Sequence, residues 1–429
     1  MNLLIYDSGL FTHVAQAMVR HFDRVMYWAE WKRMMPKGAQ RYIGEGLPGV
    51  ERVVDLWDAI DEADLILFTD VGTGDLQDYL RRQGKIVWGP GHGESLELDR
   101  EGLKDIMKQV GLPSPSFASI VGIPALREYL KDKADLFLKV STMRGDWETT
   151  HHELPSLTGP ILDCESSSLG PLQRRMRFLV ESPIPDATEI GYDGWCIDGQ
   201  FPQTNILTGI EIKDCGYAGA ITEHYRELPE QVRFVNERLA PVFKYFGYRG
   251  FWSDEIRIPS DGTPYLIDPT CRCGSPPSQL FVEMYANWQD ILFNGAQGIV
   301  IEPKVVKPYG VMAVIYAEES ENWIPLEYDQ ADAQWIKLRH EMIDENGTHW
   351  ICPQEVHFGQ VGYVVGIGDT LLEAMENVVK ASRSIKGPVT IKLGAMGKAI
   401  EEIEKAEKLG MKFGRKPLPT MAQIHKVIS

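Results

Sequence analysis

The stretch GYRGFWSDEIRIPSDGTPYLIDPTCRCGSPPSQ, residues 247–279, decides the fold that we predict. Residues 251–258 alternate apolar and polar side chains, residues 260–264 have the composition of a turn, and residues 265–269 read as a second short strand. Two such runs joined by a short turn are typical of an antiparallel β-hairpin. We therefore predict a hairpin at the edge of a sheet.

The predicted hairpin carries two carboxylates, Glu255 on its first strand and Asp268 on its second. Thr270 lies two residues beyond Asp268 and is expected on the same face, and Arg272 is two residues further on. Mg²⁺ usually takes one or two carboxylates and completes its coordination with phosphate oxygens and water. The stretch alone leaves two interpretations open: a magnesium–nucleotide site, or a solvated hairpin with ordinary surface charges.

The composition is that of a globular protein of more than one domain. The chain has 429 residues, of which 44% are hydrophobic and 24% charged, and this length predicts two or three domains. Its net charge is −17 and its pI is about 5.1. This charge argues against a partner such as bulk nucleic acid, although it leaves room for a local basic groove.

Targeting and redox features favour a reduced cytoplasmic protein. No apolar run reaches the roughly 18 residues of a membrane span, and the start MNLLIYDSG lacks the basic region of a signal peptide. Six cysteines in so long a chain are not a disulfide framework. Cys271 and Cys273 suggest zinc only weakly, because no second Cys or His pair stands at ligand spacing.

Residues 1–95 alternate predicted strands and helices, which indicates an α/β domain with a parallel sheet. Ligands of such sheets bind at the carboxyl ends of the strands, where the turns at 7–9 and 69–74 fall. No G-x-G-x-x-G follows the first strand, so dinucleotide binding is disfavoured.

Residues 96–300 are expected to form one domain, with a smaller α+β segment at about 114–182 that we call the lid segment. The domain opens with a helix that carries Arg100 and ends at Gly111. In the lid segment, Lys139 ends an apolar strand and precedes a polar loop that contains Gly145. A loop with spare donors could cover phosphates, although the pattern by itself favours an ordinary hairpin.

The pattern changes again near residue 301, and residues 301–390 read as a β-rich C-terminal domain. Asp369, Thr370 and Glu373 form a capping-box signal at the start of a helix. Residues 391–429 are predicted to be a helical tail.

The order of these pieces resembles the ATP-grasp ligases, and most closely the phosphoribosylamine–glycine ligases. The resemblance covers nearly the whole chain and rests on an ordered set of segments: IVWGP, DREGLKDIMKQVGLPSP, FLKV, FLVESPIPDATEI, the hairpin, CRCGSPPSQ and GYVVGIGDTLLEAMENV. The spacing of 13 residues between Glu255 and Asp268, with Thr270 two beyond, is similar to the metal site of that family. The implied fold is an N-terminal Rossmann-like domain, an ATP-grasp domain of two α+β subdomains and a β-rich C-terminal domain.

The resemblance implies ATP and Mg²⁺ (or Mn²⁺) as cofactors. Six positions match the family's nucleotide-binding residues: Arg100, Lys139, Gly145, Glu181, Ile184 and Glu189. Arg100 would meet the phosphates, and Lys139 would reach the α-phosphate and adenine. The Gly145 loop would close over the phosphates, and the hinge Glu181–Ile184 would contact adenine through backbone groups. Glu189 would bind the ribose hydroxyls.

The metal ligands implied by the resemblance are Glu255, Asp268 and Thr270, where the family usually has glutamate, glutamate and asparagine. Arg272 would stabilise the transferring phosphoryl group and the acyl phosphate, and Lys213 would face the same cleft.

The expected activity is ATP-dependent joining of a small carboxylic acid and a small amine through an acyl phosphate, as an amide-forming ligase. The Asn-Thr-Gly-Gly-Met-Gly stretch of the purine enzymes is missing, and Thr69 to Gly72 replaces their Gly-Pro-Glu. We therefore expect substrates other than glycine and phosphoribosylamine. Two alternatives stay open: an ATP-binding sensor or scaffold without ligase activity, and a ligase acting on a modified nucleotide or a macromolecular amine. A homodimer is possible.

Overall fold

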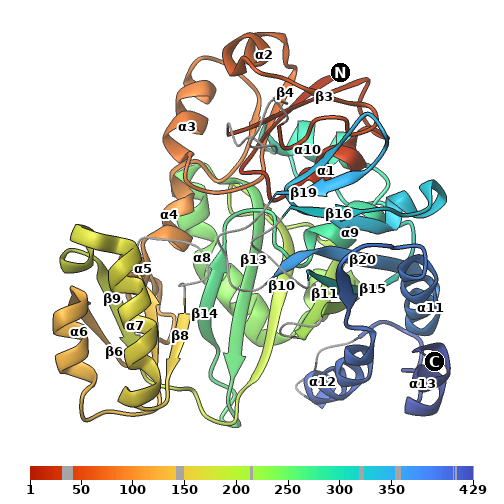
Figure 1. Cartoon of the computed structure of the whole chain (residues 1–429). Coiled ribbons are helices and arrows are strands. Elements are labelled where there is room, and N and C mark those ends of the chain that lie inside the picture. Colours follow the sequence, from red (N-terminus) through yellow and green to blue (C-terminus); the bar gives the residue numbers. More distant parts are fainter. Residues whose placement is uncertain are drawn as a thin grey trace.

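The computed structural model of the protein describes residues 1–30, 42–141, 149–212, 216–317, 323–352, 359–408, 410 and 413–428. Figure 1 shows the N-terminal unit (red and orange) at one end of a central antiparallel sheet (green). The lid segment (yellow) lies to one side of that sheet, and the last helices (blue) lie to the other.

The N-terminal unit is a parallel sheet, as the alternating strands and helices predicted. Its five strands are arranged in the order β3-β2-β1-β4-β5, and each neighbouring pair is parallel. The strands are β1 (Asn2–Asp7), β2 (Arg24–Ala29), β3 (Val50–Arg52), β4 (Leu65–Phe68) and β5 (Val87–Trp88), with helices α1 (Thr12–Met18), α2 (Leu56–Glu62) and α3 (Gly74–Arg82). Strands β1 and β4 therefore end side by side, at Asp7 and Phe68, and the N–H of the next residue, Thr69, donates to the carbonyl of Tyr6.

Two helices, α4 (Ser95–Leu98) and α5 (Arg100–Val110), connect this unit to the lid segment. Asp99 caps α5, because its carboxylate accepts the backbone N–H of Gly102 at 3.0 Å. The helix ends at Gly111, as predicted, in the left-handed conformation (φ 75°) that glycine adopts without steric cost.

The lid segment has a four-stranded antiparallel sheet in the order β6-β9-β7-β8. Its elements are β6 (Phe117–Val121), α6 (Ile123–Leu130), β7 (Leu136–Val140), β8 (Thr149–His152), α7 (Pro155–Leu169) and β9 (Arg177–Glu181). The segment has a small apolar core of its own, in which Leu126 of α6 and Leu162 of α7 pack on Phe178 and Val180 of β9.

The central sheet contains the predicted hairpin at its edge and runs β14-β13-β10-β11-β12-β15-β20-β17 through the described residues, with β21 beside β15. Its strands are β10 (Thr188–Ile197), β11 (Thr204–Ile212), β12 (Gly216–His224), β13 (Arg249–Ile258), β14 (Tyr265–Thr270), β15 (Tyr309–Ala317), β17 (Ile336–Leu338), β20 (Gln360–Gly368) and β21 (Val389–Ile391). Strand β12 pairs with β15, so the strands that follow residue 301 continue the same sheet.

Helices cover both faces of this sheet and form two apolar clusters. On one face, Tyr192, Trp252 and Ile256 pack with α8 (Glu230–Phe246), α11 (Leu371–Ser382) and α12 (Met396–Lys408). On the other face, Trp195 and Phe251 pack with α9 (Ser278–Met284), α10 (Trp288–Gly295) and α1 of the N-terminal unit. The last helix, α13 (Met421–Ile428), packs on α11.

A small sheet of β16 (Ile324–Leu326), β19 (His349–Ile351) and β18 (Glu341–Ile343) lies against the N-terminal unit. The Glu341 carbonyl accepts the backbone N–H of Gly44, and the Glu341 carboxylate accepts the amide of Gln16 on α1. The C-terminal part of the chain therefore contacts the N-terminal unit directly.

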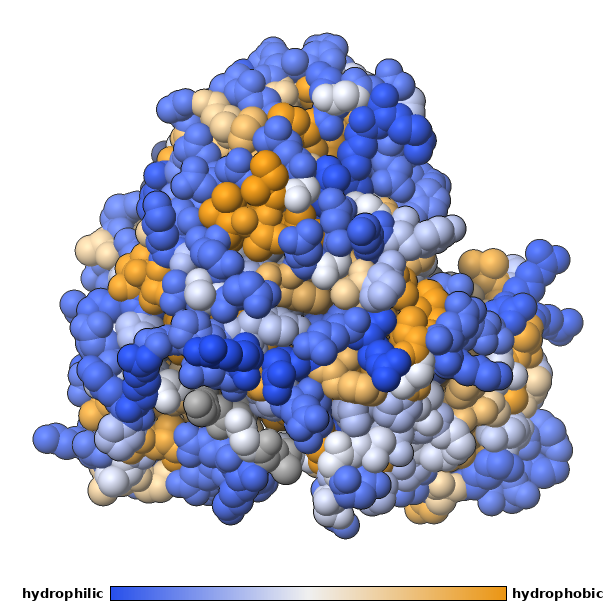
Figure 2. Space-filling view, turned by 180° about the vertical axis from the view of Figure 1, so that it is seen from behind, coloured by the Kyte–Doolittle hydropathy of each residue, from blue (hydrophilic) through white to orange (hydrophobic). Residues whose placement is uncertain are grey.

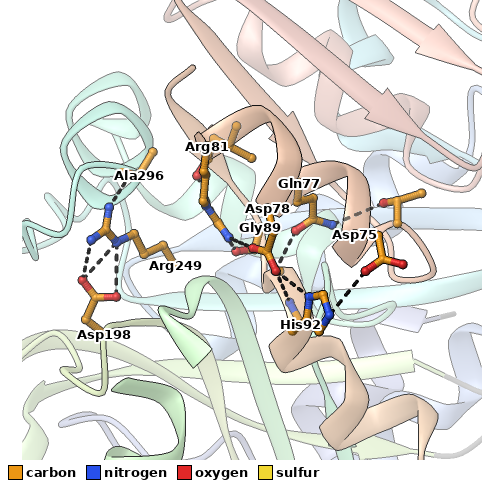
Figure 3. A network of polar contacts seen from close by, with 12 residues as sticks. Asp75, Gln77, Asp78, Arg81, Gly89, His92, Asp198, Arg249 and Ala296 are labelled. Atoms are coloured by element: carbon orange, nitrogen blue, oxygen red, sulfur yellow. Dashed lines mark hydrogen bonds and ion pairs between the residues drawn. The ribbon is translucent and has the colours of Figure 1, made fainter. Parts of the chain in front are cut away.

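Figure 3 shows the polar junction between the N-terminal unit and the central sheet. Arg81 of α3 donates to the carbonyl of Gly89 at 2.6 Å, and Gly89 makes a bridge with Arg249 at the start of β13. Arg249 in turn is paired with Asp198 and donates to the carbonyl of Ala296. These contacts fix the edge of the parallel sheet relative to the hairpin.

The surface is mainly polar. Figure 2 shows hydrophilic side chains over most of one face, with apolar side chains in separate groups. Within the described ranges, no helix is long and apolar enough to cross a membrane.

Candidate active site

The hairpin β13–β14 brings the two predicted carboxylates face to face. Glu255 pairs with Asp268 across the strands, and Ser253 pairs with Thr270. Directly opposed residues of an antiparallel pair point to the same face, so Glu255, Asp268 and Thr270 share one face of the sheet, as the sequence predicted. Glu189 on β10 pairs with Arg257, two residues beyond Glu255, and lies on that face too.

This face concentrates negative charge around Glu255. Burial, then the neighbouring Glu189 with which it shares a hydrogen bond, and then Asp268 and Glu211 raise the pKa of Glu255 well above its usual range. Carboxylates crowded in this way favour either a proton or a cation between them. No group of three or more His, Cys, Asp or Glu within the part of the chain that the structure describes forms a metal site by itself. Two carboxylates and a hydroxyl nevertheless fit Mg²⁺ that arrives with nucleotide phosphates.

Arg100 lies beside the hairpin. It is only 6% exposed, and its Nη1 donates to Oδ1 of Asp268 at 3.2 Å. Asp99 and Arg100, adjacent at the start of α5, have different roles: Asp99 caps the helix, and Arg100 reaches the carboxylate of the second hairpin strand.

Lys139, at the end of β7, also reaches the hairpin. Its Nζ donates to the carbonyl of Ile267, next to Asp268, at 2.7 Å, and lies 3.2 Å from Oε2 of Glu181. Lys139 is 7% exposed and Glu181 is 3% exposed. The structure thus brings Lys139 and Glu181 of the lid segment together with the hairpin β13–β14.

Lys104 is a residue that the sequence interpretation missed. It lies on α5, four residues after Arg100, and forms a buried ion pair with Glu181. Burial lowers the pKa of Lys104 from its usual value, partly offset by Glu181. Lys139 and Lys104 lower the pKa of Glu181, although its burial acts in the opposite direction. The i, i+4 spacing of Arg100 and Lys104 on one helix was the available signal.

Ile184 lies in the loop between β9 and β10, which joins the lid segment to the central sheet. Within the described residues its backbone N–H has no hydrogen-bond partner. At the other end of this loop, Glu189 is half-buried and is paired with Arg257 at 3.2 Å. Within the described residues, the loop therefore has a backbone donor that is free for a ligand.

Arg272 lies at the carboxyl edge of the parallel sheet. Its Nε donates to Oε1 of Glu97 at 3.0 Å and lies 3.8 Å from Oδ1 of Asp70, the residue that follows Thr69. Asp70 also accepts the hydroxyl of Ser8 in the turn after β1. Asp70 lies in the turn at 69–74 that the sequence placed at the ligand-binding ends of the strands. Glu97 was not singled out from the sequence, because only the folded chain places it beside Arg272.

Two of the predicted site residues, Gly145 and Lys213, lie outside the described residues.

The comparisons with known proteins agree with this architecture. No protein-family model matches the sequence, and no curated protein matches it. Among solved structures, the chain is similar to a phosphoribosylamine–glycine ligase from Thermotoga maritima, with a TM-score of 0.69 and 15% identity over 91% of this chain and 99% of that chain. It is also similar to the biotin carboxylase domain of the 2-oxoglutarate carboxylase from Hydrogenobacter thermophilus, solved with MgADP, ADP and bicarbonate. That match has a TM-score of 0.63 and 14% identity, and it covers 96% of this chain and 95% of that chain.

An L-amino acid ligase from Bacillus licheniformis matches with a TM-score of 0.60 and 15% identity, over 90% of this chain and 98% of that chain. The chain thus has the fold of the ATP-grasp ligases. In particular, its arrangement is that of the phosphoribosylamine–glycine ligase fold, along nearly the full length of both chains.

Proposed function

We propose that this protein is an ATP-dependent carboxylate–amine ligase that forms an amide-type bond and releases ADP and phosphate. The observation that carries the proposal is the convergence of Glu255, Asp268, Arg100 and Lys139 between the lid segment and the central sheet. Acids and cations at the junction of two α+β units are suited to an ATP phosphate chain and its metal ion. The names of the similar structures support the reaction class.

The nucleotide is expected to bind between the lid segment and the central sheet. Lys139 and Arg100 would neutralise its phosphates, the Ile184 N–H would donate to the adenine ring, and Glu189 would accept the ribose hydroxyls. Lys104 would act as a positioning residue, because it shares Glu181 with Lys139.

Glu255 and Asp268, with Thr270, would hold Mg²⁺, which supplies charge neutralisation for phosphoryl transfer. Their crowded carboxylates fit a cation, since the pKa of Glu255 is raised by burial, Glu189 and Asp268.

The chemistry would proceed in two displacements. An oxygen of the acid substrate attacks the γ-phosphorus of ATP, the bond to the β,γ-bridging oxygen breaks, and ADP leaves. The amine then attacks the acyl carbon, phosphate leaves, and the amine proton passes to solvent or phosphate. Arg272, fixed by Glu97 beside Asp70, would stabilise negative charge on the transferring group and on the acyl phosphate. Gly145 and Lys213 are proposed on the sequence resemblance alone.

ADP formation by the purified protein tests this proposal. The protein, Mg²⁺ and ATP are incubated with pooled small carboxylic acids, with and without pooled amines. ADP formation that depends on a particular acid and amine pool is the expected result. AMP in place of ADP would overturn the acyl-phosphate mechanism, because it would indicate an adenylate.

A second candidate function is ATP binding without ligation. The contact that favours it is the hydrogen bond between Arg100 and Asp268, since a guanidinium on a proposed metal ligand competes with the cation. ATP binding with no turnover in any pool would select this candidate.

A further inference from the structure

Arg339 is a cation at the meeting point of three parts of the fold. It directly follows β17, and its backbone N–H donates to Val361 of β20. The next residue, His340, donates its N–H to the carbonyl of Gly9, in the turn after β1. Arg339 is half-buried, and its guanidinium has no ion pair among the residues that the structure describes.

The contacts of Arg339 leave one buried donor unused. Its Nη2 donates to Ser275 Oγ at 2.8 Å and to the Tyr363 hydroxyl at 2.7 Å, and its Nη1 lies 3.4 Å from the amide oxygen of Gln360. Its Nε is buried and has no partner in the described structure. A buried guanidinium N–H without an acceptor is costly, so an acceptor is expected there when the site is filled.

The hydroxyl of Ser275 is a second donor beside the Nε–H of Arg339. Its Oγ accepts from Arg339 and also from the amide nitrogen of Gln279 at 2.7 Å, in the amide orientation of the structure. A hydroxyl has two acceptor positions and one proton, so the proton of Ser275 remains to be donated. Gln279 is fully buried, and its amide oxygen is an unpaired acceptor among the described residues. The group therefore offers N–H and O–H donors for an anion, with an acceptor next to them.

The charge of this group matches a carboxylate better than a phosphate. Lys337 is already paired with Glu283, and burial first, then Lys337 and Arg339, lower the pKa of His13 well below its usual value. Lys337 shares the Glu283 carboxylate with Arg20, and its amine contacts neither Ser275 nor Gln279 among the described residues. Arg339 is therefore the cation that faces this group, and its single charge fits a monoanion. Guanidinium and carboxylate also match in geometry.

Ser275 lies close along the chain to Arg272, a residue of the proposed reaction centre. Ser275 is three residues after Arg272, so their Cα atoms are at most about 11 Å apart. A compact molecule can therefore contact both Arg272 and Ser275.

We propose that Arg339 and Ser275 bind the free carboxylate of an amino acid, the substrate that supplies the amine. The inference rests on the proposed ligase function and assigns the class of one of its substrates. The amino group is then the nucleophile, and the carboxylate on Arg339 is not the one that is activated.

Direct binding tests this assignment without requiring turnover. The full-length protein is titrated by calorimetry with each of the twenty proteinogenic amino acids, with the carboxamides of those that bind, and with ribose 5-phosphate. At least one amino acid is expected to bind, with its carboxamide about tenfold weaker or more. Arg339→Gln is expected to weaken that binding about ten- to hundredfold, because a charge-assisted hydrogen bond is lost. Arg82→Gln, an exposed arginine on α3, is the matched control and is expected to bind as the wild type does.

Two further variants are expected to weaken binding by smaller factors: Arg339→Lys, which keeps the charge but lacks the planar guanidinium, and Ser275→Ala. They replace Arg339→Gln if that variant fails to fold. Failure of every amino acid to bind, equal binding by Arg339→Gln, or Arg339-dependent binding of ribose 5-phosphate alone would overturn the assignment. Failure of the ligase function is distinguishable, since amino-acid binding through Arg339 would then persist while no ADP forms.

Discussion

Asp268 combines two contacts in the proposed site, the hydrogen bond from Arg100 and the position opposite Glu255. We predict that Asp268→Asn lowers ADP formation at least about 100-fold, because an amide carries no charge for the metal ion. The melting temperature should change by less than about 2 °C, since the side chain is only half-buried and an amide oxygen can still accept the hydrogen bond from Arg100. The matched control is Asp261→Asn, in the turn of the same hairpin. An unchanged rate would remove Asp268 from the metal site.

Lys139 is predicted to contribute mainly to nucleotide affinity. Lys139→Met removes a charge that faces the expected phosphates while it preserves the apolar stem, so we expect the Kd for ATP to rise about tenfold or more. Fluorescence titration with a labelled ATP analogue measures this change. Lys131→Met, an exposed lysine at the end of α6, is the control. Equal affinities of wild type and Lys139→Met would exclude the phosphate contact.

Residue-scale prediction from the sequence succeeded where the signal was local. The pairing of Glu255 with Asp268 follows from strand alternation and turn length, and the register confirms it. Lys104, Glu97 and Arg339 were missed because their partners lie far away in the chain: Glu97 meets Arg272, and Arg339 meets Ser275. Apart from the i, i+4 spacing of Arg100 and Lys104, nothing in the local pattern of those residues differs from that of surface charges.

Helix α7 of the lid segment contains a carboxyl group whose protonation affects stability. Glu165 is 4% exposed, and burial raises its pKa to about 7 from 4.5, although Arg127 acts in the opposite direction. The unfolded chain releases this proton at lower pH than the folded chain does, so the folded state loses stability as pH rises from about 4.5 to about 7. The full loss is present above pH 7.

We therefore predict that Glu165→Gln, which is neutral at every pH, melts within 1 °C of the wild type at about pH 4.5 and about 2–4 °C higher at pH 8. Thermal denaturation followed by circular dichroism at both pH values measures the difference. Glu128→Gln, an exposed glutamate on α6, is expected to show no such pH dependence. A variant difference that is the same at both pH values would contradict the burial account of Glu165.

The capping box at the start of α11 provides a test at the scale of one helix. Thr370 Oγ1 accepts the N–H of Glu373, and the Glu373 carboxylate accepts the N–H of Asp369, which confirms the sequence prediction. Thr370→Ala is expected to lower the free energy of unfolding by about 1 kcal/mol and to leave ATP affinity unchanged. Urea denaturation measures the loss, with the exposed Thr390→Ala on β21 as the control. A loss no larger than that of the control would show that the cap contributes little.

Elements with strong periodicity were predictable, and long-range pairings were not. The strands of residues 1–95 and the helix that ends at Gly111 follow from local patterns. The pairing of β12 with β15, which extends the central sheet past residue 301, joins segments separated by α8, the hairpin, α9 and α10. Periodicity places a residue on a face of its own strand but does not say which distant strand lies beside it.

The arrangement of the whole molecule places three sources of side chains around one region. The carboxyl edge of the parallel sheet contributes Asp70, the segment after β14 contributes Arg272, and the lid segment contributes Lys139, which reaches the hairpin at Ile267. Apolar packing of α1 and α9 against the central sheet fixes the N-terminal unit, and the Arg81–Gly89–Arg249 junction fixes its edge (Figure 3). The ordered segments of the sequence predicted this arrangement only through a family resemblance, because no residue pattern specifies how the units dock.

Hydroxylamine trapping tests the central claim, that this fold activates a carboxylate as an acyl phosphate, most directly. Protein, Mg²⁺, ATP and the acid pool are incubated with hydroxylamine in place of the amine, and hydroxamate and ADP are quantified together, with Asp268→Asn as the inactive control. The account predicts hydroxamate and ADP in equal amounts, dependent on one acid and absent from the variant. Wild-type protein that binds ATP and yields no hydroxamate with any acid, or yields hydroxamate together with AMP, would contradict it.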